Sequence, residues 1–504
     1  MIRTRTPQTA LCVLLSLALL APGAWTQPAP LEGLDAYIAQ GMTDWEVPGL
    51  AIAVVHGDSV VFARGYGLRE LGGSDPVDEH TLFAIASTSK AFTTGALGML
   101  VDDGRIGWDD AVTAHLPGFK LADPHVTREI TIRDLVTHNA GLERHDQLWI
   151  SAPFDRDEIL RRARHIPRAN GFRERYGYNN IMYITAGEVV GAAAGTSWDD
   201  FLEARVFGPL GMARSTTRTA VVDARSNVSA SHNRHEGRPQ VTPRRDYDNI
   251  GGAGAVFSSA REMAEWVRLH LNGGEHTGRR LIEEETIREM LSPQTVMPMD
   301  GTFRNRFPGT QSRAYGLGWY LQDYHGTPLV HHSGSINFTR THVGMLPEHG
   351  VGVVVMTNLS SSNLQQALVY RVLDAYLGRE PRDWSGHFLA ASRAAAERSA
   401  ERDRETDAAR ISGTSPALAL DAYAGRYTSD LYGEMPITLE GDGLVLRYSP
   451  DYVADVVHWH HDTFRAVWRR GGYGSTFLTF TVDHRGRITA MDAEGYGRFE
   501  RIRD

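Results

Sequence analysis

The hydrophobic pattern near the start of the chain changes between a helical and an extended period. Apolar residues recur at helical spacing over residues 31–44, which predicts an amphipathic helix. Two β-rich runs follow, at residues 50–56 and 60–66, on either side of a Gly57-Asp58 turn, and they predict a hairpin. Residues 83–101 are apolar almost all round, a pattern that predicts a buried helix.

The rest of the first 380 residues divides into a helical middle and a β-rich end. Helical patterns occupy residues 131–137, 181–193, 198–206 and 260–271. From residue 315 the period changes, and short β-rich runs at 317–322, 328–335, 341–346 and 352–357 predict an antiparallel meander, followed by a helix at 363–377. A hairpin at one end and a meander at the other predict one antiparallel sheet built from both ends, with helices beside it. The expected fold class is α/β (α+β).

The C-terminal part of the chain predicts a separate small domain. Residues 386–416 are rich in Ala, Arg and Glu and then in turn-forming residues, which predicts a charged helical linker after a main domain at 27–385. Within residues 417–504, short alternating runs lie at 436–439, 444–448, 463–468, 477–482 and 488–492. This spacing favours a small all-β sandwich or barrel.

The first 26 residues have the pattern of a secretory signal peptide. Arg3 and Arg5 precede an apolar run at residues 10–21, and small residues follow around Ala24. A membrane anchor is the alternative, but a run of about 12 residues is short beside the ~20 that a spanning helix needs. We expect export to the periplasm or the medium, with no membrane span after signal removal. Cleavage would also remove Cys12, the only cysteine, so neither a disulfide framework nor a Cys-rich zinc site is expected.

Charge and composition limit the classes of partner and cofactor that the protein is expected to bind. The formal net charge of −9 argues against nucleic-acid binding, which normally needs a basic face. Three histidines, His458, His460 and His461, could suggest a metal site, but no carboxylate or cysteine completes the set, and exposed strand residues are the preferred interpretation. We therefore predict no metal and no cofactor.

The strongest chemical signal is Ser87-Thr88-Ser89-Lys90. Residues three apart share a helix face, so Lys90 can reach the Ser87 hydroxyl. A serine becomes a good nucleophile when a neighbour takes its proton, and a buried lysine, unlike an arginine, can do so as a neutral amine. Of the 52 basic residues only Lys90 and Lys120 are lysines, which gives Lys90 weight. A capping serine beside a solvated lysine is the alternative, but the flanking run is apolar.

Two weaker motifs lie downstream. Tyr178-Asn179-Asn180 could supply a phenol to shuttle a proton and an amide, Asn180, to hold a substrate carbonyl. Tyr247-Asp248-Asn249 has the same pattern, but it leads into a glycine-rich segment that we expect to be a flexible loop, whereas Tyr178 leads into a helix.

His332-Ser333-Gly334-Ser335 lies on a predicted strand. Gly334 would let a substrate backbone approach closely, and the amides of Ser335 and Ser87 could form an oxyanion hole. His276 and His484 also begin His-x-Gly matches, but His276 follows the end of a helix.

Taken in order, these three motifs resemble those of the serine β-lactamase, penicillin-binding-protein and D-peptidase superfamily, and the class C-like branch (peptidase S12 type) in particular. Further stretches are similar to that branch, and the tail is similar to the lipocalin-like β domain appended to some of its members. These stretches are residues 48–50, 137–142, 209–212 and 315–319, with 423–427 and 462–464 in the tail. The resemblance covers about residues 32–378 for the main domain.

The resemblance implies the role of each site residue. Ser87 would be acylated, Lys90 would activate it with Tyr178 as partner base and later acid, and Asn180 would bind the acyl side of the substrate. His332 stands where other members have a lysine, and a neutral imidazole is a weaker anchor for a substrate carboxylate. This departure fits peptidase, amidase or esterase activity on other substrates. The preferred reaction is hydrolysis of an amide or peptide bond, with D-residue and peptidoglycan-type peptides as candidates.

Several alternatives stay open on the sequence. A carboxylesterase or a weak β-lactamase of the same superfamily is the nearest rival, and a ligand-binding protein that has lost turnover is a rival of another class. His138 could be catalytic, but a helix-ending turn with Asn139 and Gly141 is preferred. The C-terminal domain could cover the mouth of the active site, or it could mediate self-association into an oligomer.

Overall fold

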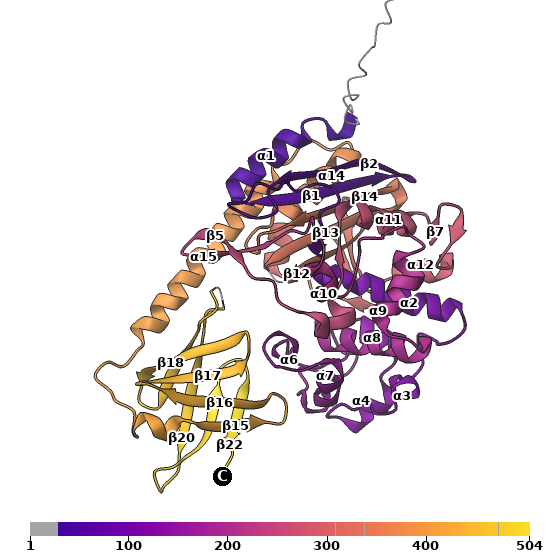
Figure 1. The fold of residues 1–504 in the computed structure, drawn as a ribbon. Helices are drawn as coiled ribbons and strands as arrows, with labels where there is room; N and C mark the ends of the chain where they lie inside the picture. Colours follow the sequence, from indigo (N-terminus) through magenta and orange to yellow (C-terminus); the bar gives the residue numbers. More distant parts are fainter. Residues whose placement is uncertain (1–28, 308, 337, 472, 504) are drawn as a thin grey trace, which may run out of the picture.

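The computed structural model describes residues 29–307, 309–336, 338–471 and 473–503. Its larger part is built on one eight-stranded antiparallel sheet (Figure 1). In spatial order the strands are β2 (Ser59–Gly67), β1 (Gly49–His56), β14 (Val351–Thr357), β13 (Thr339–Leu346), β12 (Thr327–Ile336), β11 (Tyr320–Tyr324), β10 (Arg313–Tyr315) and β9 (Thr295–Val296). The N-terminal hairpin joins the later strands where β1 pairs with β14. The prediction of one sheet built from both ends of the domain is confirmed.

Both faces of this sheet are buried. Helices α1 (Leu34–Trp45) and α14 (Leu364–Tyr376) cover one face, and α11 (Ala260–Leu271) packs on β1 and β14 from the other. Strand β1 shows how the sequence achieves this, because Leu50, Ile52 and Val54 point into one core while the intervening alanines and Val55 point into the other. Each large side chain buried in this way stabilises the fold by roughly 1.5–3 kcal/mol.

A helical region lies beside the sheet and holds α2 (Ser89–Asp102) and α8 (Asn180–Ala194). The helix predicted over residues 83–101 begins only at Ser89. Residues Phe83–Ala84 (β3) instead pair with Phe257–Ser258 (β6), and Ala86–Thr88 form a short 3-10 turn. An apolar run cannot distinguish a buried strand from a buried helix, so the hydrophobic pattern placed this boundary too early.

The C-terminal part is a closed eight-stranded barrel that follows the long helix α15 (Trp384–Ala408) (Figure 1). Its strands are β15 (Gly425–Ser429), β16 (Gly433–Glu440), β17 (Gly443–Ser449), β18 (Tyr452–His460), β19 (Thr463–Trp468), β20 (Ser475–Val482), β21 (Ile488–Ala493) and β22 (Gly497–Arg501). The first and last strands pair and close the barrel. The predicted small all-β domain is confirmed as a barrel, although the strand pattern had not included β15, β18 or β22.

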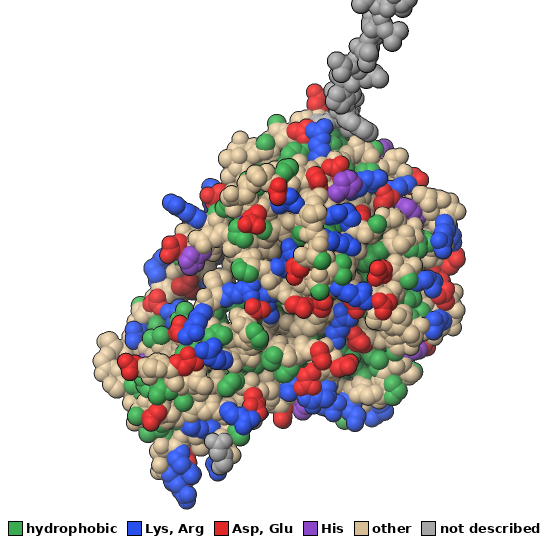
Figure 2. All heavy atoms as spheres, viewed as in Figure 1, with side chains coloured by type: hydrophobic (Ala, Val, Ile, Leu, Met, Phe, Trp, Pro, Cys, Tyr) green, Lys and Arg blue, Asp and Glu red, His purple; other side chains and the backbone are tan. Residues whose placement is uncertain are grey.

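The barrel contacts the helical region close to residues 143–151. The Tyr432 hydroxyl lies 2.7 Å from His145 Nδ1, and the Tyr496 hydroxyl donates to Ser151 Oγ at 3.0 Å. On the other side of this interface, Arg245 pairs with Asp451 at 3.0 Å. Charged side chains of both signs are interspersed over the face of the molecule drawn in Figure 2.

The predicted signal peptide, residues 1–26, lies outside the described residues. Among the residues that the structure does describe, none of the helices is both long enough and apolar enough to cross a bilayer.

Candidate active site

Ser87 lies in a strained turn that leads into helix α2. The preceding residue, Ala86, has a φ of 53°, a left-handed conformation that costs a non-glycine residue about 1–3 kcal/mol. This backbone reversal ends the β3 segment and presents Ser87 at the head of α2, where its side chain is only partly buried and lines a cleft of about 580 Å³. Lys90 follows in the first turn of the helix, as the spacing predicted.

The Lys90 amine is fully buried and contacts three oxygens. Its Nζ lies 3.1 Å from Ser87 Oγ, 2.7 Å from Asn180 Oδ1 and 2.8 Å from the carbonyl oxygen of Ala253. The last two can only accept, so a neutral amine donates its two hydrogens to them and directs its lone pair at the serine hydroxyl. Burial lowers the pKa of Lys90 well below 10.5, and the charge of Arg144 lowers it further, while Asp146 opposes the shift.

The Tyr178 phenol approaches the same serine from the other side. Its hydroxyl donates to Ser87 Oγ at 2.8 Å, and burial raises its pKa well above 10. The position follows from the start of helix α8, because Asn179 is the N-cap and accepts a hydrogen bond from the Met182 amide. Tyr178 therefore precedes the helix, and Asn180 is its first residue.

A second layer of polar residues holds Asn180 in place. Asn180 Nδ2 donates to Asp146 Oδ1 at 2.9 Å, and Trp149 Nε1 donates to the same oxygen at 2.9 Å. Arg144 pairs with Asp146, and its guanidinium lies 4.9 Å from the centre of the Tyr178 ring. Asp146 and Arg144 were not predicted from the sequence, because they lie on a loop with no periodic pattern or motif.

His332 lies in the wall of the cleft with both ring nitrogens engaged by the protein. Nδ1 is 2.8 Å from the carbonyl oxygen of Ser333, so it carries the hydrogen, and Nε2 then accepts from the Tyr315 hydroxyl at 3.1 Å. Burial and the nearby Lys90 lower the pKa of His332 to about 3. The neutral imidazole expected from the sequence is thus present, but its two nitrogens already have partners other than substrate.

Gly334 brings strand β12 against the turn that carries Ser87. A Cβ atom at this position would lie 2.1 Å from the carbonyl oxygen of Ile85. The sequence had predicted that Gly334 lets a substrate backbone approach closely. In the structure the close approach is instead to the protein's own backbone. It holds the neighbouring Ser335 beside the turn that carries Ser87.

Gly334→Ala tests this contact. Because the Ile85 carbonyl belongs to the backbone and cannot move aside cheaply, we expect a loss of about 1–3 kcal/mol in the free energy of unfolding, with lower hydrolytic activity. Chemical denaturation and ester turnover measure the two effects. Gly118→Ala is the matched control, because a Cβ there meets no atom within 4 Å. Equal stability of the two variants would contradict the assignment.

The competing motifs lie away from Ser87. Asn249 Nδ2 bonds the carbonyl oxygens of Trp149 and Phe154, and His276 bonds Glu265. The glycine-rich segment after Asn249, expected to be a flexible loop, is buried, and it supplies the Ala253 carbonyl to Lys90.

His138 follows helix α5 (Ile132–Val136) in a left-handed turn, as preferred from the sequence. The centre of its ring lies 4.3 Å from the centre of the Tyr178 ring, and its Nδ1 accepts a hydrogen bond from the Asn179 amide. His138 therefore helps to position the Tyr178 segment without contacting Ser87.

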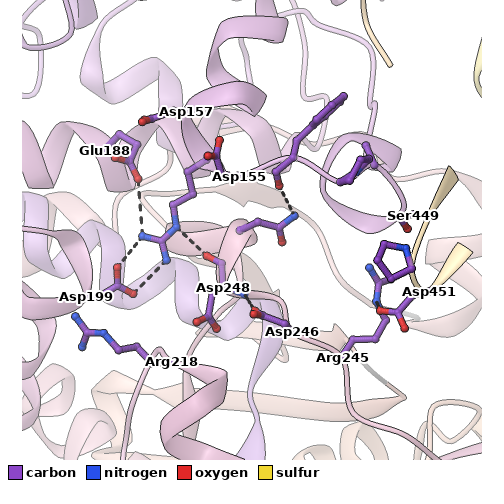
Figure 3. A pocket seen from close by; sticks show the side chains of 16 residues that line it. Asp155, Asp157, Glu188, Asp199, Arg218, Arg245, Asp246, Asp248, Ser449 and Asp451 are labelled. Carbon is purple, nitrogen blue, oxygen red and sulfur yellow. Dashed lines mark hydrogen bonds and ion pairs between the residues drawn. The ribbon is translucent and has the colours of Figure 1, made fainter. Parts of the chain in front are cut away.

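A larger cavity, of about 720 Å³, lies between the barrel and the helical region (Figure 3). Three of its acidic residues are paired within the cavity, since Asp199 and Glu188 both lie against Arg156 and Asp451 binds Arg245. The base and phenol that flank Ser87 are not among the residues lining this cavity. We therefore place the chemistry in the smaller cleft.

The described residues contain no cluster of three or more His, Cys, Asp or Glu side chains arranged to hold a metal ion. In β18 the register shifts between His458 and His460, and His458 bonds the carbonyl oxygen of His461.

A serine hydroxyl held between a buried amine and a phenol defines the class of protein as a serine hydrolase of the Ser-x-x-Lys type. The family comparison agrees, since the profile described as Beta-lactamase matches residues 34–377, and the chain belongs to that family. A second profile, described as a domain of unknown function (DUF3471), matches residues 409–501, which contain the barrel.

Similar proteins of named function support the same class. Unguisins hydrolase ungD of Aspergillus violaceofuscus is 30% identical over 439 residues, covering 82% of this chain and 77% of the relative. Penicillin-binding protein 4 of Amycolatopsis lactamdurans is 30% identical over 327 residues, covering 63% and 82%. The octameric penicillin-binding protein homologue from Pyrococcus abyssi shares the fold, with a TM-score of 0.62 at 22% identity over 93% of this chain and 99% of that one.

Proposed function

We propose that this protein hydrolyses amide or peptide bonds of small substrates through a covalent acyl-enzyme on Ser87. The observation that carries the proposal is the environment of the Lys90 amine. Two carbonyl oxygens accept hydrogen bonds from the Lys90 amine, and its remaining hydrogen-bond contact is the Ser87 hydroxyl at 3.1 Å. This arrangement prepares a base for the serine before any substrate arrives.

In the proposed first step, Lys90 accepts the hydroxyl proton while Ser87 Oγ attacks the substrate carbonyl. The amides of Ser87 and Ser335 are proposed to hold the oxygen that becomes negative. Tyr178, which keeps its proton at neutral pH, then donates to the departing amine. In the second half-reaction water attacks the acyl-enzyme and gives one proton to the Tyr178 phenolate. Lys90 returns its proton to Ser87 Oγ as the acid product leaves, so the site regains its starting charge.

The preferred substrates are amides and peptides, including D-residue and peptidoglycan-type peptides. Two relatives are named for hydrolysis of unguisins and for penicillin binding, which supports acyl transfer from amide-type carbonyls. An ester or a β-lactam is the second candidate, because the same base and phenol would serve it. We also propose that the chain is exported, on the pattern of its first 26 residues.

For the barrel we propose a role at the border of the cleft. Tyr432 contacts His145, which directly precedes Asp146, and Tyr473 stacks on Phe338 with ring centres 6.1 Å apart. Phe338 lies three residues after Ser335 in the chain, so the barrel contacts the segment that follows Ser335 and the segment that precedes Asp146. Self-association is the alternative role, and one structural relative is described as octameric.

Covalent labelling tests the proposed function. A fluorophosphonate probe or a labelled penicillin should modify the wild-type protein at Ser87, and Ser87→Ala should give no label. Ser333→Ala is the matched control, because it removes another serine hydroxyl from the same cleft and should be labelled like the wild type. Peptide mass spectrometry locates the adduct. Equal labelling of Ser87→Ala and wild type would exclude Ser87 as the nucleophile.

A further inference from the structure

The cleft that contains Ser87 is also lined by arginines. Arg144, Arg306, Arg313 and Arg340 all border it, and Asp300 is the one acidic residue among its described lining residues. The Asp300 carboxylate caps helix α13 (Gly301–Arg306) by accepting the amide hydrogen of Phe303. This concentration of positive charge contrasts with the net charge of −9 for the whole chain.

Three of these arginines have no acidic partner among the described residues, although Arg306 and Arg340 donate to neutral oxygens of the protein. Arg306, Arg313 and Arg340 make no ion pair with any carboxylate of the described residues, and Nε of both Arg306 and Arg313 is buried without a hydrogen-bond partner there. Burial and the charge of Arg306 lower the pKa of Arg340, and Arg313 acts in the same direction on Arg306. Burying like charges together is unfavourable unless a group of opposite charge joins them.

Two histidines lie beside the arginines, and their ring nitrogens have no hydrogen-bond partner among the described residues. His331 and His342 are buried and stack with ring centres 5.5 Å apart and planes inclined by 10°. Among the described residues none of their four ring nitrogens has a hydrogen-bond partner, although both side chains line the cleft. Burial, together with the positive charge of Arg306, holds the pKa of His342 at about 3, so this ring is neutral and offers one N–H donor.

The position of these groups relative to Ser87 follows from the strand. Successive side chains of β12 point to opposite faces, so His331 lies on the other face from His332, which contacts Tyr315 near Lys90. His342 lies towards Tyr370 of helix α14. The cleft therefore continues from the nucleophile past β12 to the arginines near α13 and α14.

We propose that Arg306, Arg313 and Arg340, with the His331–His342 pair, form a subsite for a carboxylate on the substrate. Guanidinium groups match the planar geometry of a carboxylate, and the imidazole N–H groups can add neutral donors. The subsite supplies the positive charge that His332 lacks at its own position. This inference rests on the proposed function, because it assigns the subsite to the substrate that acylates Ser87.

Matched ester substrates test the subsite. In the first pair, one ester carries a carboxylate on its phenol leaving group and the other carries a neutral carboxamide at the same position. In the second pair, the carboxylate and the carboxamide are on the acyl chain. We expect the wild type to prefer the carboxylate in one pair by roughly tenfold in kcat/KM, the scale of a charge-assisted hydrogen bond. Arg306→Gln and Arg313→Gln should each reduce that preference, measured as the ratio of kcat/KM values within the pair.

The control variant is Arg304→Gln, which removes an exposed arginine on the same helix outside the cleft and should keep the preference. A wild type without preference in either pair, or variants that retain it, would overturn the subsite. Ser87 labelling by a fluorophosphonate would still succeed in that case, so the proposed function would stand separately.

Equilibrium binding gives a readout that does not need turnover. Benzene-1,3-dicarboxylate should bind the wild type in a calorimetric titration, and the corresponding diamide should not. Arg306→Gln and Arg313→Gln should each weaken the dicarboxylate roughly tenfold. Equal affinity of the wild type for the two probes would contradict the proposal even if no ester substrate were found.

Discussion

Replacing Lys90 by arginine is expected to slow acylation of Ser87 about a thousandfold, within the range by which a positioned base accelerates proton transfer. The amine can take the serine proton because burial keeps it neutral, whereas a guanidinium stays charged in proteins. The larger head group also has to fit among Asn180, Ala253 and Ser87, which surround the amine. The rate of fluorophosphonate labelling and kcat/KM for a neutral ester measure the loss.

The chain supplies its own control for this substitution. Lys120, the other lysine, is exposed, so Lys120→Arg makes the same chemical change at a site outside the cleft and should leave both rates near wild type. Circular dichroism and thermal unfolding of Lys90→Arg show whether the fold survives. A folded Lys90→Arg protein with wild-type labelling would show that another group takes the proton.

The second large effect is expected from Tyr178→Phe, and it should depend on the leaving group. The phenol holds its proton because burial raises its pKa well above 10, so it can act as an acid to a poor leaving group. We expect about a hundredfold loss on an anilide or alkyl ester and a smaller loss on a nitrophenyl ester, whose leaving group needs no proton. Paired kcat/KM values for the two substrate types measure the difference.

The same two residues predict the pH profile. Lys90 must be neutral, so activity should rise as pH increases through its lowered pKa, which lies well below 10.5. Tyr178 must stay protonated, so activity should fall only above pH 10. The alkaline fall should disappear in Tyr178→Phe. Tyr176→Phe is the control, because it removes a hydroxyl that lines the same cleft and bonds Tyr320. For Tyr178→Phe, an equal loss of kcat/KM on the anilide or alkyl ester and on the nitrophenyl ester would argue against an acid role of Tyr178.

The strained turn before Ser87, rather than the helix that follows it, sets the position of the serine in the cleft. The sequence predicts a helix through residues 83–101, which would make Ser87 an ordinary helical residue on the surface of a buried element. In the structure the left-handed Ala86 and the contact of Gly334 with Ile85 set the serine at the edge of the cleft. Neither feature has a hydrophobic period, so pattern analysis places the helix start six residues too early.

The second layer around Lys90 shows a similar limit. The spacing of Ser87 and Lys90 implies contact, because helix geometry fixes the separation of residues three apart. Asp146 and Ala253 belong to segments 56 and 163 positions after Lys90 in the chain. Asp146 joins the amine network through Asn180, and Ala253 contacts the amine directly. No local rule connects such distant segments, and their meeting depends on how α2, α8 and the glycine-rich segment pack together.

The sequence by itself determined the sheet with its flanking helices, the β-rich tail, and the motif that carries the nucleophile and its base. These follow from local periodicity and spacing, because backbone geometry fixes which residues share a face. Only the tertiary structure decided where Ser87 points, how His332 is occupied, how the barrel closes, and that unpaired arginines and two stacked histidines line the same cleft. Those features arise from contacts between residues far apart in the chain, and packing rather than local pattern sets such contacts.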